Sequence, residues 1–249
     1  MTWMVRMRWV AALVLAGAAW LSAGDKSEKP KPVTSQMVDS GSFGVFVKGQ
    51  RVVTETFSVQ QENGISVVKS RLQETNPSAA ASQTSELQMT GAGELVRYEW
   101  SDGSGSLIVT PNNEFLLEKM KTSPSAKFAE QPFLMPSTSA ILDNNFFAHR
   151  QVLGWRYLAT NCRTEGGTLK CQKGAVEFGV LVPQDRTSLR VRMELAGREK
   201  VSIRGTEREL LRLDLKGEAF SWVLWVDDKD QFKLIRVLIP DANTEVVRD

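Results

Sequence analysis

Regular alternation of apolar and polar residues is the clearest pattern in the chain, and it predicts β-strands over the last third. Two segments carry an apolar residue at every second position: Leu189, Val191, Met193 and Leu195 in the first, and Leu211, Leu213 and Leu215 in the second. A period of two indicates a sheet with one buried face and one face in water. The segment 222–226 (WVLWV) is apolar at each position and therefore predicts a strand covered on both faces.

Turn sequences separate the strand-like runs of residues 43–121. Asn63-Gly64 is the strongest of them, because both central residues of a type I′ hairpin turn need a positive φ. Further turns are expected at 48–50, 91–93, 102–105 and 111–113. Strands that are joined by turns and not by helices predict an antiparallel meander.

One segment, residues 136–154, has the pattern of a helix. Its apolar face carries Leu142, Phe146, His149 and Leu153 at the spacing i, i+4, i+7 and i+11. Ser137 to Ser139 offer an N-cap and Gly154 suits the C-terminal stop. We predict a single amphipathic helix over about 137–153, packed on the sheet, which makes the fold class mainly β (α+β).

The first 24 residues differ in character from the rest. Arg6 and Arg8 precede an apolar run over residues 9–21, and the small residues Ser22 and Gly24 end the segment. This is the pattern of a secretory signal peptide cleaved after Gly24, so we expect a periplasmic or secreted protein. The alternative is an N-terminal membrane anchor, but a helix over this run would be about 20 Å long, against about 30 Å for the hydrocarbon core.

Two regions follow the segment 1–24. Residues 25–42 are polar, begin DKSEKPKPVTSQ and contain two prolines, which predicts a flexible linker. Residues 43–249 show no internal repeat and no second change in composition, so we expect one β-rich domain. The 249 residues are 42% hydrophobic and 24% charged, which is ordinary for a globular protein.

The charge of the chain argues against nucleic acid as a partner. The formal charge of +2 comes from Arg6 and Arg8, so the part after Gly24 has equal numbers of basic and acidic residues and no basic block. Such a balance offers neither an electrostatic footprint for nucleic acid nor a polybasic patch for anionic lipid.

The two cysteines, Cys162 and Cys171, stand near the ends of NCRTEGGTLKC. With Gly166-Gly167 as a hairpin turn, antiparallel pairing places Cys162 opposite Cys171 in a non-hydrogen-bonded pair, where Cα atoms approach to about 4.5 Å. We therefore predict a structural disulfide, as expected for an exported chain with an even number of cysteines. An exchange-active pair and a metal site are the alternatives, but a zinc site would need more ligands than one histidine, His149, supplies.

No combination of residues in the sequence predicts catalysis. His149 is the sole histidine, no G-x-S-x-G motif accompanies it, and on an apolar helix face a core histidine is more common than a general base. Asp227, Asp228 and Asp230 could suggest calcium, but they lack the glycine and distal glutamate of an EF-hand loop and are typical of a charged hairpin turn. We expect no enzyme, no cofactor and no metal.

The order of the elements resembles the LolA/LolB superfamily of periplasmic proteins, in its uncharacterised bacterial branch. The resemblance is carried by ILDNNFFAHRQVLGWRY (141–157) and WVLWVDDKDQFKLIRVLIP (222–240), within an exported chain of β-meanders and one helical insert. It implies a half-barrel, in which a curved antiparallel sheet has its concave face covered by the helix. It also implies binding of lipids or acylated proteins between sheet and helix, with no shared catalytic residue.

A half-closed sheet cannot fill its own concave face, so side chains or a ligand must occupy it. The expected lining comes from the helix, the loop between Pro132 and Pro136, and the strand at 222–226: Phe133, Leu134, Met135, Leu142, Phe146, His149, Leu153, Trp222 and Trp225. The tryptophans could equally be ordinary packing residues. We expect an exported envelope protein that binds a lipid or other hydrophobic ligand in this cavity. The alternative is a non-catalytic structural or assembly protein that docks an envelope protein partner.

Overall fold

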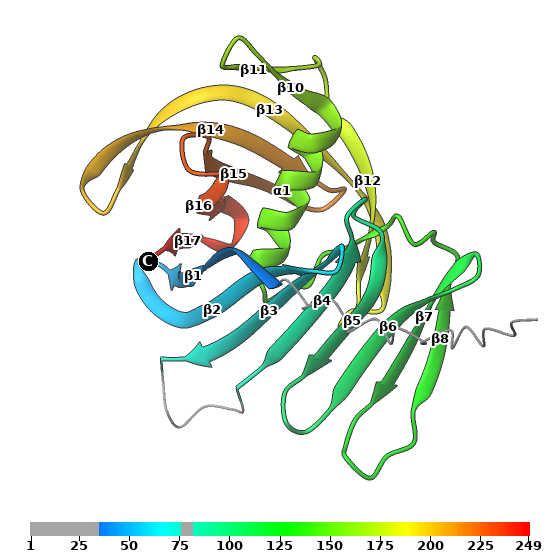
Figure 1. Cartoon of the computed structure of the whole chain (residues 1–249). Helices are drawn as coiled ribbons and strands as arrows, with labels where there is room; N and C mark the ends of the chain where they lie inside the picture. Colours follow the sequence, from blue (N-terminus) through cyan, green and yellow to red (C-terminus); the bar gives the residue numbers. More distant parts are fainter. Residues whose placement is uncertain (1–34, 76–81) are drawn as a thin grey trace, which may run out of the picture. The chain divides into compact units, whose positions relative to one another are not determined.

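β-Strands make up most of the chain that the structure describes, which is residues 35–75 and 82–249 of a computed structural model. Fifteen strands form one sheet in the order β8-β7-β6-β5-β4-β3-β2-β1-β17-β16-β15-β14-β13-β12-β9, and two more form a separate hairpin (Figure 1). The first series is β1 (Ser35–Val47), β2 (Gln50–Glu62), β3 (Ile65–Glu74), β4 (Thr84–Thr90), β5 (Leu95–Ser101), β6 (Ser106–Asn112), β7 (Phe115–Lys121) and β8 (Ala129–Phe133).

The second half of the chain contains the helix and the remaining strands. After β9 (Ala140–Ile141) come α1 (Ala148–Asn161) and the hairpin of β10 (Cys162–Glu165) and β11 (Thr168–Cys171). The last series is β12 (Val176–Val182), β13 (Thr187–Ile203), β14 (Thr206–Lys216), β15 (Ser221–Asp227), β16 (Lys233–Ile239), the 3-10 turn η1 (Pro240–Ala242) and β17 (Thr244–Arg248). All described residues belong to one compact unit.

The first and last strands join the two halves of the sheet. β1 pairs antiparallel with β17, from Phe43 opposite Arg248 to Val47 opposite Thr244. Among the described strands, β9 and β12 are the one parallel pair. The sheet curves around α1 without closing into a barrel (Figure 1). The predicted class, mainly β with one helix and a curved sheet, is confirmed at this level.

Two local predictions for the strands are confirmed, whereas the turn predicted at 111–113 begins only after β6 ends at Asn112. Asn63 and Gly64 have φ values of 51° and 79° in the turn between β2 and β3. The strand 222–226 lies in β15 and is covered on both sides, because Leu224 belongs to the main core whereas Trp225 belongs to a second apolar cluster. Successive side chains of a strand point to opposite faces, so these two clusters lie on opposite sides of the sheet.

The predicted helix boundaries, 137–153, are wrong. α1 begins at Ala148 and continues to Asn161, while Ala140 and Ile141 pair with β12 as a short strand. Gly154 does not stop the helix but lies inside it, on the side that faces β14: a Cβ there would lie 3.5 Å from Leu213, an ordinary van der Waals contact. The glycine therefore marks neither the end of the helix nor a position that excludes a small side chain.

The predicted linker is too long at its C-terminal end. β1 begins at Ser35, and from there to residue 42 the chain pairs with β2, with Asp39 buried at a bulge. The predicted signal peptide, residues 1–24, and the start of the linker lie outside the described residues. None of the helices within residues 35–75 and 82–249 has the length and apolar character needed to cross a bilayer.

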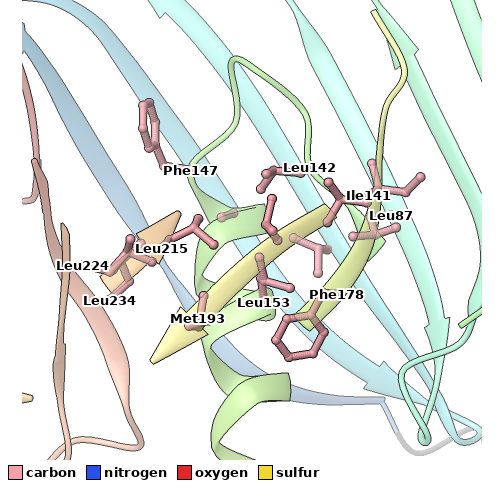
Figure 2. Close-up of a cluster of buried hydrophobic side chains, with 14 of the residues drawn as sticks. Leu87, Ile141, Leu142, Phe147, Leu153, Phe178, Met193, Leu215, Leu224 and Leu234 are labelled. Atoms are coloured by element: carbon pink, nitrogen blue, oxygen red, sulfur yellow. The ribbon is translucent and has the colours of Figure 1, made fainter. Parts of the chain in front are cut away.

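The main core lies between α1 and the concave side of the sheet. Figure 2 shows side chains from both halves of the chain meeting there: Leu87, Ile141, Leu142, Phe147, Leu153, Phe178, Met193, Leu215, Leu224 and Leu234. Burial of one such side chain contributes about 1.5–3 kcal/mol. Packing, more than intrinsic helix propensity, therefore holds α1 in place.

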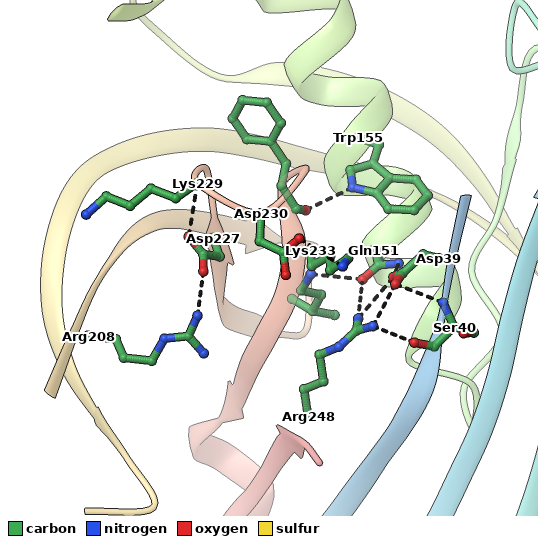
Figure 3. Close-up of polar contacts among 12 residues, drawn as sticks. Asp39, Ser40, Gln151, Trp155, Arg208, Asp227, Lys229, Asp230, Lys233 and Arg248 are labelled. Atoms are coloured by element: carbon green, nitrogen blue, oxygen red, sulfur yellow. Dashed lines mark hydrogen bonds and ion pairs between the residues drawn. The ribbon is translucent and has the colours of Figure 1, made fainter. Parts of the chain in front are cut away.

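A buried polar network fixes α1 to the junction of β1 and β17 (Figure 3). The amide of Gln151 donates to Asp39 at 2.7 Å and accepts from the N–H of Leu234 at 2.8 Å. Arg248 reaches both carboxylate oxygens of Asp39, at 2.7 and 3.0 Å, and also the carbonyl of Ser40 at 2.9 Å. These hydrogen bonds therefore connect β1, β16, β17 and α1 around the ion pair of Asp39 and Arg248.

The predicted disulfide is confirmed. Cys162 and Cys171 are bonded, and the register of β10 and β11 pairs 162 with 171 and 165 with 168, as the Gly166-Gly167 turn predicts. Lys170 also meets Glu165 across the hairpin at 2.8 Å. The hairpin follows directly on the last residue of α1, so the disulfide fixes a structure that covers the end of the helix.

Candidate functional site

The residues predicted to line one cavity occupy different environments. Five are buried: Phe133, Met135, Leu142, Phe146 and Leu153. Trp222 packs partly buried against the main core, whereas Trp225 belongs to the second cluster on the other face. Leu134 is 92% exposed. Most of these side chains pack in the hydrophobic core and fill the space between the sheet and the helix.

Trp222 is held by a buried arginine. Arg150 of α1 is 1% exposed, and its guanidinium lies 4.8 Å from the ring centres of both Phe147 and Trp222. The guanidinium donates to the backbone carbonyls of Asp143, Phe146 and Asn144, the residues just before the helix. These bonds organise the segment that leads into α1.

His149, the last predicted lining residue, lies in the core and is 1% exposed. Its ring meets the edge of Tyr98, with the ring centres 5.7 Å apart, and neither ring nitrogen has a hydrogen-bond partner among the described residues. The adjoining space has a volume of about 20 Å³ and is bordered by Leu87 and Leu153, so it would hold about one water molecule. Burial lowers the pKa of His149 to about 4, and the ring is neutral at pH 7.

The N-terminus of α1 is capped by a carboxylate from a distant strand. Glu55 of β2 accepts hydrogen bonds from the N–H groups of Phe147 at 2.5 Å and Ala148 at 3.1 Å. The hydroxyl of Ser70 donates to it at 2.8 Å. Burial nevertheless raises the pKa of Glu55 to about 7, because desolvation disfavours the charged form more than these bonds favour it.

An apolar groove lies at the C-terminal end of α1. Four elements form its walls: the start of β1, the last turns of α1, the β10–β11 hairpin and the turn between β15 and β16. It has a volume of about 360 Å³ and is lined by Val38, Trp155, Leu158, Ala159, Cys162, Arg163, Thr164, Leu169, Gln231 and Phe232. Ligand pockets usually measure about 300–1,000 Å³ and have mainly apolar walls with a few polar groups, which describes this groove.

One wall of the groove is held in a strained conformation. Gln231 and Phe232 have φ values of 53° and 55°, a left-handed backbone that bulky residues seldom adopt. The indole N–H of Trp155 donates to the carbonyl of Phe232 at 2.9 Å and so fixes the turn against α1 (Figure 3). Positive φ values also occur at non-glycine residues in other hairpin turns of the sheet, such as Lys48 and Arg204, so the conformation belongs to the turn.

Polar residues line the groove on two sides, with Gln231 in the turn between β15 and β16 and the others in the hairpin. Arg163 and Thr164 come from β10, beside the disulfide that holds the hairpin over the groove. Val38 of β1 adds exposed apolar surface to the groove, with 36% of its area accessible. The groove therefore suits a ligand with an apolar chain and a polar or anionic head.

The groove was not expected from the sequence, because the predicted helix ended before Gly154 and the helical residues that line the groove follow it. Trp155, Leu158 and Ala159 follow that glycine at the spacing i, i+3 and i+4, which is the continuation of a helical face. That spacing was the signal that could have identified them.

The three aspartates of the predicted charged turn are paired with cations. Asp227 pairs with Arg208, Asp228 with Arg198, and Asp230 with Lys233 at 2.8 Å. Asp227 ends β15 and the others lie in the turn before β16, which confirms the hairpin. In the part of the chain that the structure describes, no three histidine, cysteine or carboxylate side chains gather as a metal site would require.

Comparison with known proteins gave no match: no protein-family model, no curated protein and no solved structure is similar to this chain.

Proposed function

We propose that this protein binds a lipid, or another ligand with an apolar chain, in the groove at the C-terminal end of α1. The observation that carries the proposal is the groove itself, with a volume of about 360 Å³ and with Trp155, Leu158 and Phe232 in its walls. Each Å² of apolar surface that a ligand buries there contributes about 25 cal/mol. Arg163 lies where it can meet an anionic head group.

We also propose that the fold is a half-barrel like that of the LolA/LolB superfamily and that the protein resides in the cell envelope. The curved sheet with α1 in its concavity supports the half-barrel. The Cys162–Cys171 disulfide supports an oxidising compartment. The proposed ligand site differs from the one that the resemblance implies, because the side chains between sheet and helix already fill that space.

Filling the groove should prevent binding while the protein stays folded. Ala159 lines the groove and is exposed, so Ala159→Phe is expected to weaken binding of a dansyl-labelled fatty acid about tenfold or more. Its free energy of unfolding should change by about 0.5 kcal/mol or less, as for other surface substitutions. Fluorescence titration and urea unfolding measure the two quantities.

Thr160→Phe is the matched control, since it adds the same ring at the next exposed position, outside the groove. The control should bind like the unaltered protein. No binding by the unaltered protein, or equal binding by both variants, contradicts the proposal.

A second candidate function is docking of an envelope protein partner, and Leu134 favours it. Its side chain is 92% exposed beside a groove of about 470 Å³ that Met135, Phe178 and Leu189 also line. Leu134 and the apolar residues of this groove together offer exposed apolar surface that a protein partner could cover.

A photo-cross-linking residue at position 134 should capture one stoichiometric protein in cells if this surface docks a partner. The same residue at position 200, an exposed site on β13, serves as the control and should capture nothing. Equal capture at both positions, or none at 134, speaks against a partner at Leu134.

A further inference from the structure

A second groove, of about 930 Å³, crosses the outer face of strands β2 to β7. One row of polar side chains runs along it, with one residue from each strand in direct register: Thr56, Arg71, Thr84, Ser101, Ser106 and Lys121. The row ends at Phe128, which follows β7 and is 42% exposed. The ammonium of Lys121 lies 4.9 Å from the centre of the Phe128 ring.

The length of this row indicates an extended ligand. Neighbouring strands are about 4.8 Å apart, so the five steps from Thr56 to Lys121 span about 24 Å. A compact metabolite would meet a small part of such a row, whereas a polymer could lie along all of it.

Two cations of the row are available to a ligand. Arg71 donates to the hydroxyl of Ser82 at 2.7 Å and forms no ion pair with a carboxylate of the described residues, and neither does Lys121. The carboxylates that line the groove are occupied: Glu86 by Lys69 at 3.3 Å and Glu99 by Arg97. Because Arg71 and Lys121 are four strands apart, about 19 Å, they suit negative charges repeated along a polymer.

The strands beneath the groove leave no backbone groups for a peptide. β3, β4, β5 and β6 each have a hydrogen-bonded neighbour on both sides, so a peptide cannot add to the sheet as a further strand. Recognition has to come from side chains. Serine and threonine hydroxyls both donate and accept, which matches the hydroxyls of a sugar, and the exposed face of Phe128 offers an apolar surface to the C–H face of a sugar ring.

We propose that the outer face of β2–β7 binds a strand of acidic polysaccharide. Arg71 and Lys121 pair with its anionic groups, the hydroxyl row contacts its sugar hydroxyls, and Phe128 packs against one ring. This site is separate from the apolar groove at the end of α1 and shares none of its lining residues.

Calorimetric titration of the full protein with an oligogalacturonate long enough to span the groove tests the proposal. Arg71→Gln and Lys121→Gln should each weaken binding about tenfold, the effect of losing one charge-assisted contact. Phe128→Ala should also weaken binding, although it removes no charge. Arg190→Gln is the control, since Arg190 is 81% exposed on β13 in the other half of the sheet, and it should bind like the unaltered protein.

Poly-glutamate separates recognition of a polysaccharide from attraction to any polyanion. Weak binding of poly-glutamate, together with a loss of oligogalacturonate binding in Phe128→Ala, supports the proposal. The proposal is overturned if the unaltered protein does not bind oligogalacturonate. It is equally overturned if poly-glutamate binds as well while Phe128→Ala has no effect, or if Arg190→Gln loses as much affinity as Arg71→Gln.

Discussion

Replacing Arg248 with alanine is expected to lower the free energy of unfolding by about 3–5 kcal/mol. Arg248 is the counter-ion of Asp39, whose side chain is 2% exposed, and the substitution would leave that carboxylate buried without a charge partner. It would also remove the contacts of the guanidinium with the rings of Phe43 and Phe57. Urea unfolding followed by circular dichroism measures the change.

Arg51→Ala is the matched control for this prediction. Arg51 pairs with Asp249 near the same junction, but the two side chains are 32% and 26% exposed, so the loss should be at most about 1 kcal/mol. Removing both buried charges in Asp39→Asn with Arg248→Met should restore part of the stability that Arg248→Ala loses. A loss in Arg248→Ala no larger than in Arg51→Ala would show that the network does not fix the helix to the sheet.

The stability of the protein should change little between pH 7 and about pH 4.5, because two buried groups act in opposite directions. The folded pKa of His149 is lowered from 6.5 to about 4, so its contribution is present above pH 6.5 and is lost as the pH falls toward 4. The folded pKa of Glu55 is raised from 4.5 to about 7, so its contribution is present below pH 4.5 and is lost as the pH rises through 7. Each shift corresponds to about 3 kcal/mol.

Two variants separate these opposing effects. In Glu55→Gln, His149 still titrates and the opposing effect of Glu55 is gone. The unfolding free energy of this variant should therefore fall by about 3 kcal/mol on acidification from pH 7 to 4.5. In His149→Leu, Glu55 still titrates and the opposing effect of His149 is gone. The unfolding free energy of this variant should rise on the same acidification. Glu118, whose pKa burial also raises, is common to both variants and does not alter their difference. Parallel pH profiles of the two variants would contradict the assignment.

The parts of the fold that depend on neighbouring residues could be predicted from the sequence. The Asn63-Gly64 turn requires two positive φ values, and the register of the Cys162–Cys171 pair follows from the position of its turn. Strand faces follow from alternation alone. In each case the cause lies within about ten residues of its effect.

The parts that depend on distant residues could not be predicted. The start of α1 is fixed by Glu55, 92 residues before Phe147, while the local serines that suit an N-cap lie outside the helix. Asp39 lies in a segment with the polar composition of a linker, and its burial is explained by the ion pair with Arg248. The apolar groove needs four elements from separate parts of the chain, so the pattern of any one segment reveals only one of its walls.

The junction of β1 and β17 also sets the order in which the protein can assemble. Asp39 and Arg248 are 209 residues apart, so during synthesis the edge of β1 stays without its neighbour until nearly all of the described chain has been made. Contacts of such long range form slowly, since the entropy of closing the intervening loop is lost before the contact forms. The sheet can therefore be completed only after translation has passed β17, and an unfinished chain offers an open strand edge to any protein that recognises one.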